Sequence, residues 1–298
     1  MRRTLRLPLL PALSALAVAL PGCGSDDLDE QVAKVRTQAE QIRKDVQRQI
    51  DQAEQEFERR KERYGDRIDE VLAQVEKAFE RPERTSPKVR SNGNNQPQTI
   101  DAFLTDVLGS VDGFWTKTLA TADLPEPRVT YDWIPPGGRS LTACGEQAGD
   151  DAAFYCPADD TIYVAQSFAA RLYEGVLRGL PGEREGHAAG DFAVAYVIAH
   201  EYAHNLQTEL GIFSSVSSDT AKPFELQADC LAGVWAYSAF AEGAITSEDI
   251  EEAARAALAV GDFDIDAKQH HGTPQERRAA LLTGFRSGRP SSCDEYLV

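Results

Sequence analysis

The stretch FAVAYVIAHEYAHNLQTEL, residues 192–210, constrains the fold of this chain more than any other segment. It is largely apolar, contains no Pro or Gly, and is followed by Gly211, so it predicts a buried helix. His200 and His204 are four residues apart, which places both imidazoles on one helix face where they can hold one zinc ion. Glu201 is displaced around the helix and can reach a metal-bound water as a general base.

A catalytic zinc ion needs a third protein ligand besides the two histidines. Glu225 is the strongest candidate, because it opens the next predicted helix after the loop that follows the motif. Asp229 lies one turn further along the same face and could accept the free ring N–H of a ligand histidine. The alternative for this pair is a solvated acidic helix face, but the apolar residues around it favour burial.

Residues 1–22 have the features of an export signal. A positively charged start precedes an apolar run that is too short and too interrupted by Pro to span a bilayer. The run ends in the letters LPGC, which resemble the lipobox of bacterial lipoproteins, with Cys23 as the lipid-modified residue. An ordinary secretory signal or a twin-arginine signal is the alternative. We therefore expect a protein outside the cytoplasm, on the bacterial cell surface or the periplasmic face, that is anchored to the membrane or secreted.

Four cysteines follow Cys23, and an even number in an oxidising compartment predicts two disulfides with three conceivable pairings. Cys144 and Cys156 flank a short polar turn, which favours a local bridge and leaves Cys230 with Cys293. The net charge of −17 argues against binding of nucleic acid or of an anionic membrane through charge.

Residues 23–80 predict a long helical stalk, because apolar residues recur three or four apart between charged and amide residues. The heptad is irregular, so a coiled coil with itself or with a partner helix is favoured over two alternatives. These are a solitary spacer helix and an arm folded back on the following domain. Residues 81–99 are rich in Pro, Asn, Ser and Gly and predict a flexible linker.

Residues 100–298 predict a single α+β domain that is predominantly helical. Its expected helices, besides the motif helix, cover 100–120, 167–180, 223–240, about 246–260 and 274–287. Its expected strands cover 128–134, 153–156 and 161–166, of which the last two form a hairpin. His187 and His270 lie in polar loops and are expected at the surface.

Six segments of this domain carry a family resemblance: TACG at 142–145, FYCPADDTIYV at 154–164, GDFAVAYVIAHEYAHNLQ at 190–207, ELQADCLAGVWA at 225–236, HGTPQERR at 271–278, and Cys293-Asp294. In this order and spacing they resemble the bacterial neutral zinc metallopeptidase family of zincin-like proteins. The stalk and linker lie outside this resemblance.

The resemblance implies a zincin-like fold with one Zn²⁺ held by His200, His204 and Glu225, and Glu201 as the catalytic base. An E-x-x-A-D pattern of zincins whose third ligand is Glu is matched by Glu225 and Asp229. Inside the motif the chain departs from the family, because Tyr202-Ala203 replaces the commoner Val-Gly and Asn205 stands where His is frequent.

These observations predict an extracytoplasmic zinc-dependent metalloendopeptidase that acts on a protein or peptide substrate. Glu201 would take a proton from the attacking water and pass it to the departing amine. His271 is a candidate for stabilising the oxyanion, since it lies in the HGT segment and is not a proposed ligand; a place before the cap of the last helix is its alternative. Two other functions stay open: a non-catalytic lipoprotein scaffold whose stalk binds a partner, and a zinc amidase acting on cell-wall peptides.

Overall fold

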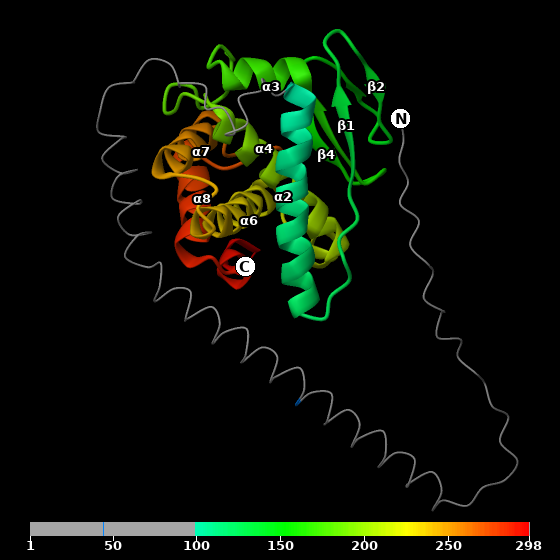
Figure 1. Ribbon diagram of the computed structural model, residues 1–298, viewed down its shortest axis with the longest axis vertical. Helices are drawn as coiled ribbons and strands as arrows, with labels where there is room; N and C mark the ends of the chain where they lie inside the picture. Colours follow the sequence, from blue (N-terminus) through cyan, green and yellow to red (C-terminus); the bar gives the residue numbers. More distant parts are fainter. Residues whose placement is uncertain (1–43, 45–98, 298) are drawn as a thin grey trace, which may run out of the picture. The chain divides into compact units, whose positions relative to one another are not determined.

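A computed structural model describes Lys44 and residues 99–297 (Figure 1). The predicted signal, Cys23, the stalk apart from Lys44, and the linker up to residue 98 therefore lie outside the described residues. Thr99, which we assigned to the linker, instead caps the first described helix, because its side chain accepts a hydrogen bond from the backbone N–H of Ala102. Within the described part of the chain, no helix is long and apolar enough to cross a membrane.

Residues 99–297 form a mixed α+β fold that is mostly helical, as the sequence predicts. In chain order the elements are α2 (Ile100–Thr121), β1 (Thr130–Ile134), β2 (Ser140–Leu141), β3 (Gln147–Ala148), β4 (Ala153–Cys156), β5 (Thr161–Ala165), α3 (Gln166–Tyr173), α4 (Asp191–Glu209), α5 (Ile212–Ser215), α6 (Lys222–Ala241), α7 (Ser247–Val260), α8 (Pro274–Ser287) and the 3-10 helix η1 (Pro290–Leu297).

The motif helix α4 is the centre of the core. It is apolar around most of its circumference, and such a helix is stable only when other elements cover all of its sides. Helices α2, α6 and α7 and strand β4 contact it. In Figure 1 the strands lie to one side of α4 and helices α6, α7 and α8 to the other. Both His200 and Glu201 are buried on this helix, as predicted.

The main sheet has the strand order β1-β5-β4. Strand β5 pairs in parallel with β1 and antiparallel with β4, so the predicted hairpin is confirmed. Strand β4 is an edge of this sheet and lies against α4. The two-residue strands β2 and β3 form a separate pair that was not predicted, because elements this short show no alternation.

Helices α6 and α8 pack with their backbones in close approach. A Cβ atom built on Gly284 would lie 1.8 Å from the carbonyl oxygen of Cys230, and one on Gly233 would lie 2.0 Å from that of Leu281. Glycine at both positions therefore allows the backbone of α8 to pack directly against the part of α6 that follows Glu225 in the sequence.

Two disulfides are present, with the pairing that the polar turn favoured. Cys144 bonds to Cys156, with a Cα–Cα distance of 5.9 Å. Cys230 bonds to Cys293, with a Cα–Cα distance of 5.5 Å, and attaches η1 to α6.

Two local expectations are wrong. Helix α3 ends at Tyr173 instead of Leu180, because Gly175 adopts a left-handed φ of 66° that stops the helix. His270 is buried instead of exposed, because its Nδ1 lies 2.6 Å from Asp262 Oδ1. His187 is half-buried.

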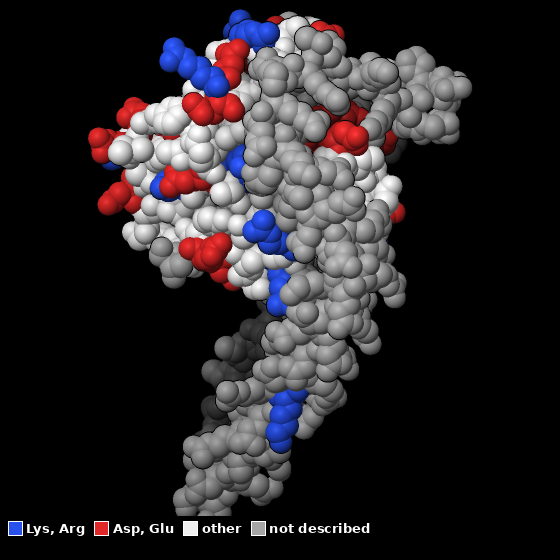
Figure 2. Space-filling model, turned by 90° about the vertical axis from the view of Figure 1, so that its left-hand side faces the viewer, with Lys and Arg blue, Asp and Glu red and all other residues white. Residues whose placement is uncertain are grey.

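On the face shown in Figure 2, acidic and basic side chains are interspersed over the described domain.

The close approach of α6 and α8 predicts a strong effect of Gly284→Ala. The added methyl group would meet backbone, which cannot rotate away, so the helices must separate. We expect the free energy of unfolding to fall by about 1–3 kcal/mol or more, measured by urea titration. Gly109→Ala in α2 is the matched control, because no atom lies within 4 Å of its added Cβ. It should be neutral or stabilise by up to about 1 kcal/mol. Equal midpoints for the two variants would contradict the packing described.

Candidate metal centre

The structure brings the three predicted zinc ligands together. His200 Nε2 lies 3.2 Å from His204 Nε2 and 3.1 Å from Glu225 Oε2. His204 Nε2 lies 3.4 Å from Glu225 Oε1. The two histidines come from successive turns of α4, and the glutamate comes from the first turn of α6.

The donor atoms of this cluster fit a zinc ion in type, spacing and charge. Ligands about 2.0–2.1 Å from a tetrahedral zinc are about 3.3–3.4 Å from one another, which is close to the three observed separations. Glu201, Glu225 and Asp229 place three carboxylates here against the single guanidinium of Arg277. With both histidines neutral, as zinc ligation requires, one divalent cation balances the two remaining negative charges of this buried cluster.

Each ligand histidine is oriented by a hydrogen bond at its other ring nitrogen. His200 Nδ1 lies 2.9 Å from Asp229 Oδ1, as predicted for Asp229. His204 Nδ1 lies 2.8 Å from Oε1 of Gln207. The Gln207 amide donates its Nε2 hydrogens to Phe224 O and to Gln227 Oε1, which turns its oxygen toward His204. Both rings therefore carry a hydrogen on Nδ1 and direct Nε2 at the metal position.

Arg277 and Tyr196 complete the surroundings of Asp229, and the sequence did not identify either of them. Arg277 Nε and one of its terminal nitrogens donate to the two Asp229 oxygens at 2.7 and 2.9 Å. Tyr196 donates its hydroxyl hydrogen to Asp229 Oδ1 at 2.5 Å. Arg277 also lies 3.4 Å from Glu225 Oε2. Its place in the HGTPQERR segment was the one available signal, since α8 is remote from α4 in sequence.

These contacts set the ionisation of the cluster. Burial opposes charge on Glu225, but His204, His200 and Arg277 outweigh it and hold its pKa well below the usual value. Burial also opposes charge on Asp229, yet Arg277 and His200 lower its pKa. Burial alone would lower the pKa of His200, but the Asp229 carboxylate raises it to about 9. Both carboxylates are thus ionised at neutral pH, which is the form that binds a cation.

Glu201 occupies a buried position beside the ligands. Its Oε2 accepts a hydrogen bond of 2.8 Å from the backbone N–H of Tyr155 on edge strand β4. Burial raises the pKa of Glu201, although His200 and His204 oppose that shift. The sequence could not show the Tyr155 contact, because it depends on how β4 packs against α4.

The candidate oxyanion stabiliser His271 contacts Asp262, which is not one of the proposed ligands. Its backbone N–H and its Nδ1 lie 2.8 and 3.3 Å from Asp262 Oδ2. The side chain is 44 % exposed. Its role in the reaction stays a prediction.

The two departures from the family motif connect α4 to its surroundings. The Tyr202 hydroxyl donates to Asp112 Oδ1 on α2 at 2.8 Å. The Asn205 amide donates to the carbonyl oxygen of Arg128 and to Asp160 Oδ1, both at 2.7 Å. These residues therefore fix the position of α4, and their hydrogen bonds go to residues other than the proposed ligands.

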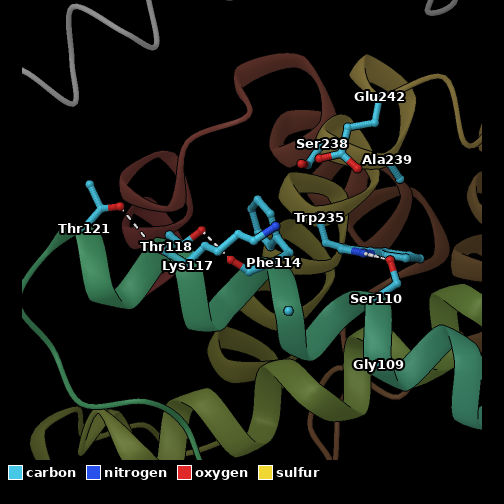
Figure 3. Close-up of a pocket in the computed structure, with 11 residues that line it drawn as sticks. Gly109, Ser110, Phe114, Lys117, Thr118, Thr121, Trp235, Ser238, Ala239 and Glu242 are labelled. Carbon is cyan, nitrogen blue, oxygen red and sulfur yellow. Dashed lines mark hydrogen bonds between the residues drawn. The ribbon is translucent and has the colours of Figure 1, made fainter.

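The described residues contain two other features of interest outside this centre. A pocket of about 440 Å³ lies between α2 and α6, and Trp235, Lys117 and Glu242 are among its lining residues (Figure 3). None of the proposed ligands lines it.

Asp191, Asp249 and Glu252 form an acidic cluster where α7 meets the start of α4. Burial and the neighbouring Asp191 raise the pKa of Glu252 to about 8, so a proton can relieve the repulsion there.

Comparison with known proteins gives a family match. A family model described as "Putative neutral zinc metallopeptidase" matches residues 61–296. The match begins inside the predicted stalk, so it extends further towards the N-terminus than the six sequence segments indicated.

Individual relatives match over part of their length. The chain is 36% identical over 179 residues to the uncharacterized protein YpfJ of Escherichia coli strain K12, covering 53% of this chain and 59% of that protein. It is 31% identical over 213 residues to the uncharacterized protein Mb2605 of Mycobacterium bovis, covering 63% of this chain and 67% of that protein. The chain thus spans less than two thirds of the length of the Escherichia coli relative. No solved structure matches the chain.

The orientation of His200 predicts that Asp229→Asn weakens zinc binding. The substitution removes the negative charge next to the His200 ring, and the guanidinium of Arg277 loses that counter-charge. We expect zinc affinity to fall about 10–100-fold, measured by competition with a chromogenic chelator. Asp262→Asn is the control, because Asp262 also bonds to a histidine but to none of the three ligands. An affinity of Asp229→Asn equal to that of the unmodified chain would show that Asp229 does not support the ligand.

The acidic cluster predicts a pH-dependent stability. Because the pKa of Glu252 is raised in the folded chain, its protonated form stabilises the fold fully below about pH 4.5. This contribution is lost as pH rises through about 8. Glu252→Gln should therefore gain stability relative to the unmodified chain between pH 5 and pH 9, measured by urea unfolding at each pH. Glu251→Gln controls for loss of a carboxylate from α7, since Glu251 pairs with Arg255 instead. A difference that stays constant with pH would refute the assignment.

Proposed function

We propose that this chain, which belongs to the neutral zinc metallopeptidase family, hydrolyses peptide bonds with Glu201 as general base. The observation that carries the proposal is the convergence of His200, His204 and Glu225, with Glu201 buried beside them. A structural zinc site is usually closed by four protein ligands. Three donors next to a buried carboxylate instead leave a coordination position for reacting groups.

A zinc ion held by these residues would supply Lewis acidity, which polarises a peptide carbonyl and makes an attacking water more acidic. The protein supplies the proton transfers. Glu201 takes the proton from the water and delivers it to the departing amine. Its burial favours this role, because a carboxylate removed from water is a stronger base. The N–H of Tyr155 holds one Glu201 oxygen in place during both transfers.

The ligand histidines depend on the polar groups behind them for their orientation. Asp229 and Gln207 keep the Nδ1 hydrogens of His200 and His204 away from the metal position. Arg277 balances part of the charge of Asp229 and Glu225. These contacts limit reorganisation when substrate binds, which supports catalysis by preorganised electrostatics.

We also propose that the protein lies outside the cytoplasm and is attached to the membrane through Cys23. The two disulfides support it, because such bonds persist in oxidising compartments. The signal-like first 22 residues support it as well. A protein or peptide of the cell envelope is the corresponding substrate class.

Glu201→Gln should separate metal binding from hydrolysis. The amide cannot accept the water proton but has nearly the same shape, so zinc content should be retained. We expect the rate of peptide cleavage to fall about 10²–10⁴-fold, measured on a peptide library by mass spectrometry. Glu209→Gln at the end of the same helix is the control, because Glu209 pairs with Arg128.

The decisive comparison uses protein with one bound zinc per chain. If the unmodified chain then cleaves no peptide that Glu201→Gln leaves intact, the peptidase proposal is wrong. A parallel digest of purified cell wall distinguishes a peptidase from an amidase, since only an amidase cleaves the bond to the glycan and releases the whole stem peptide.

A further inference from the structure

Phe213 stands next to a proposed metal ligand and is partly exposed to solvent. Its ring stacks on that of His204, with centroids 6.2 Å apart and planes 26° apart. On another side it meets Phe224, with centroids 5.0 Å apart. The residue is nevertheless 40% exposed. An aromatic ring in such a position commonly marks a binding surface.

The turn that carries Phe213 is held firmly. Gly211 adopts a left-handed φ of 69°, which ends α4 and starts α5. The carbonyl oxygen of Gly211 accepts hydrogen bonds from the hydroxyl groups of Ser214 and Ser215 at 2.8 and 2.7 Å. The backbone N–H of Ser215 bonds to the same oxygen at 3.1 Å. These bonds fix the backbone on both sides of the ring before any ligand arrives.

Core packing does not account for this aromatic ring. Helix α5 has no buried residue, and Phe213 is absent from the buried hydrophobic core of the described domain. Orientation of His204 does not require it either, because Gln207 already holds that ring at Nδ1. The ring therefore offers an apolar surface at the metal centre.

The distances place this surface within reach of a bound peptide. An extended chain advances about 3.3 Å per residue, and successive side chains point to opposite faces. In a peptide whose scissile carbonyl lies at His200 and His204, the adjacent residue is therefore about 3.3 Å further along the chain, and its side chain can reach the Phe213 ring. Phe213 and Phe224 can cover an aromatic or long aliphatic side chain there, whereas a charged side chain would lose hydration without gaining a partner.

We propose that Phe213, together with Phe224, forms an apolar subsite that selects peptides with an aromatic or long aliphatic residue next to the scissile bond. This inference rests on the proposed peptidase function. It assigns Phe213 the role of a specificity-determining residue and restricts the substrate class to hydrophobic peptide segments.

The test compares matched peptides that differ only in the residue beside the cleaved bond, Phe or Leu against Gly. The zinc-loaded full chain should prefer the Phe and Leu peptides. Phe213→Ala should lower kcat/KM for these peptides about 10–100-fold and leave the Gly peptide nearly unchanged, which removes most of the preference. Phe213→Leu should keep most of it. Tyr131→Ala is the matched control, because Tyr131 is also an exposed, stacked aromatic but lies on β1.

Binding provides a readout that does not depend on turnover. Peptide affinity is measured by calorimetry with Glu201→Gln and with the double variant Glu201→Gln/Phe213→Ala. We expect the second substitution to weaken binding of the Phe peptide about 10–100-fold and to spare the Gly peptide. Zinc content and melting temperature of every variant show whether the fold and the centre are intact.

The outcomes separate the two proposals. Cleavage by the unmodified chain with the same Phe-to-Gly preference in Phe213→Ala overturns the subsite and leaves the peptidase function standing. Loss of zinc affinity without a change in preference also overturns it, since Phe213 would then only support His204. Absence of cleavage by the zinc-loaded chain refutes the peptidase function, while the binding measurement still decides whether Phe213 recognises apolar side chains.

Discussion

The buried pair of Asp229 and Arg277 is the interaction on which the metal centre depends. Both side chains are almost fully removed from water, so each would be strongly unfavourable without the other. Two parallel hydrogen bonds, the Tyr196 hydroxyl and His200 use the oxygens of Asp229. Because the pair joins α6 to α8, the orientation of a ligand on α4 relies on the last long helix of the chain. The glycines between α6 and α8 make that approach sterically feasible.

Much of the centre could be predicted from sequence because its signals are local. His200, Glu201 and His204 share one helix, and the spacing of Glu225 and Asp229 is helical as well. The remaining partners are set by tertiary packing. Arg277 becomes a neighbour only when α8 packs on α6, and the Tyr155 N–H only when an edge strand lies against α4. Gln207 was within reach of sequence reasoning, because it lies three residues after His204, but an amide has many alternative roles.

His270 shows why composition misleads in loops. The segment between α7 and α8 is rich in charged and polar residues, which is typical of a solvated connection. In the structure Asp262 accepts contacts from both His270 and His271 and closes the segment on itself. Lys268 also accepts a backbone hydrogen bond from Ala221, at the start of the helix that carries Glu225. These hydrogen bonds order the segment beside the start of α6, and the contact with Asp262 permits the burial of His270.

The two sides of the centre differ in a way that fits the proposed hydrolase activity. The groups behind the histidines are all buried, so the ligands are oriented by side chains that solvent does not reach: Asp229, Arg277, Tyr196 and Gln207. Glu201 is held from the edge strand, and the partly exposed Phe213 stands beside His204. The side chains that support the ligands and the exposed aromatic ring beside them thus come from different elements. If the proposed subsite is correct, substitutions in α5 alter substrate preference while α6 and α8 keep the proposed metal ligands in place, and specificity is separate from metal binding.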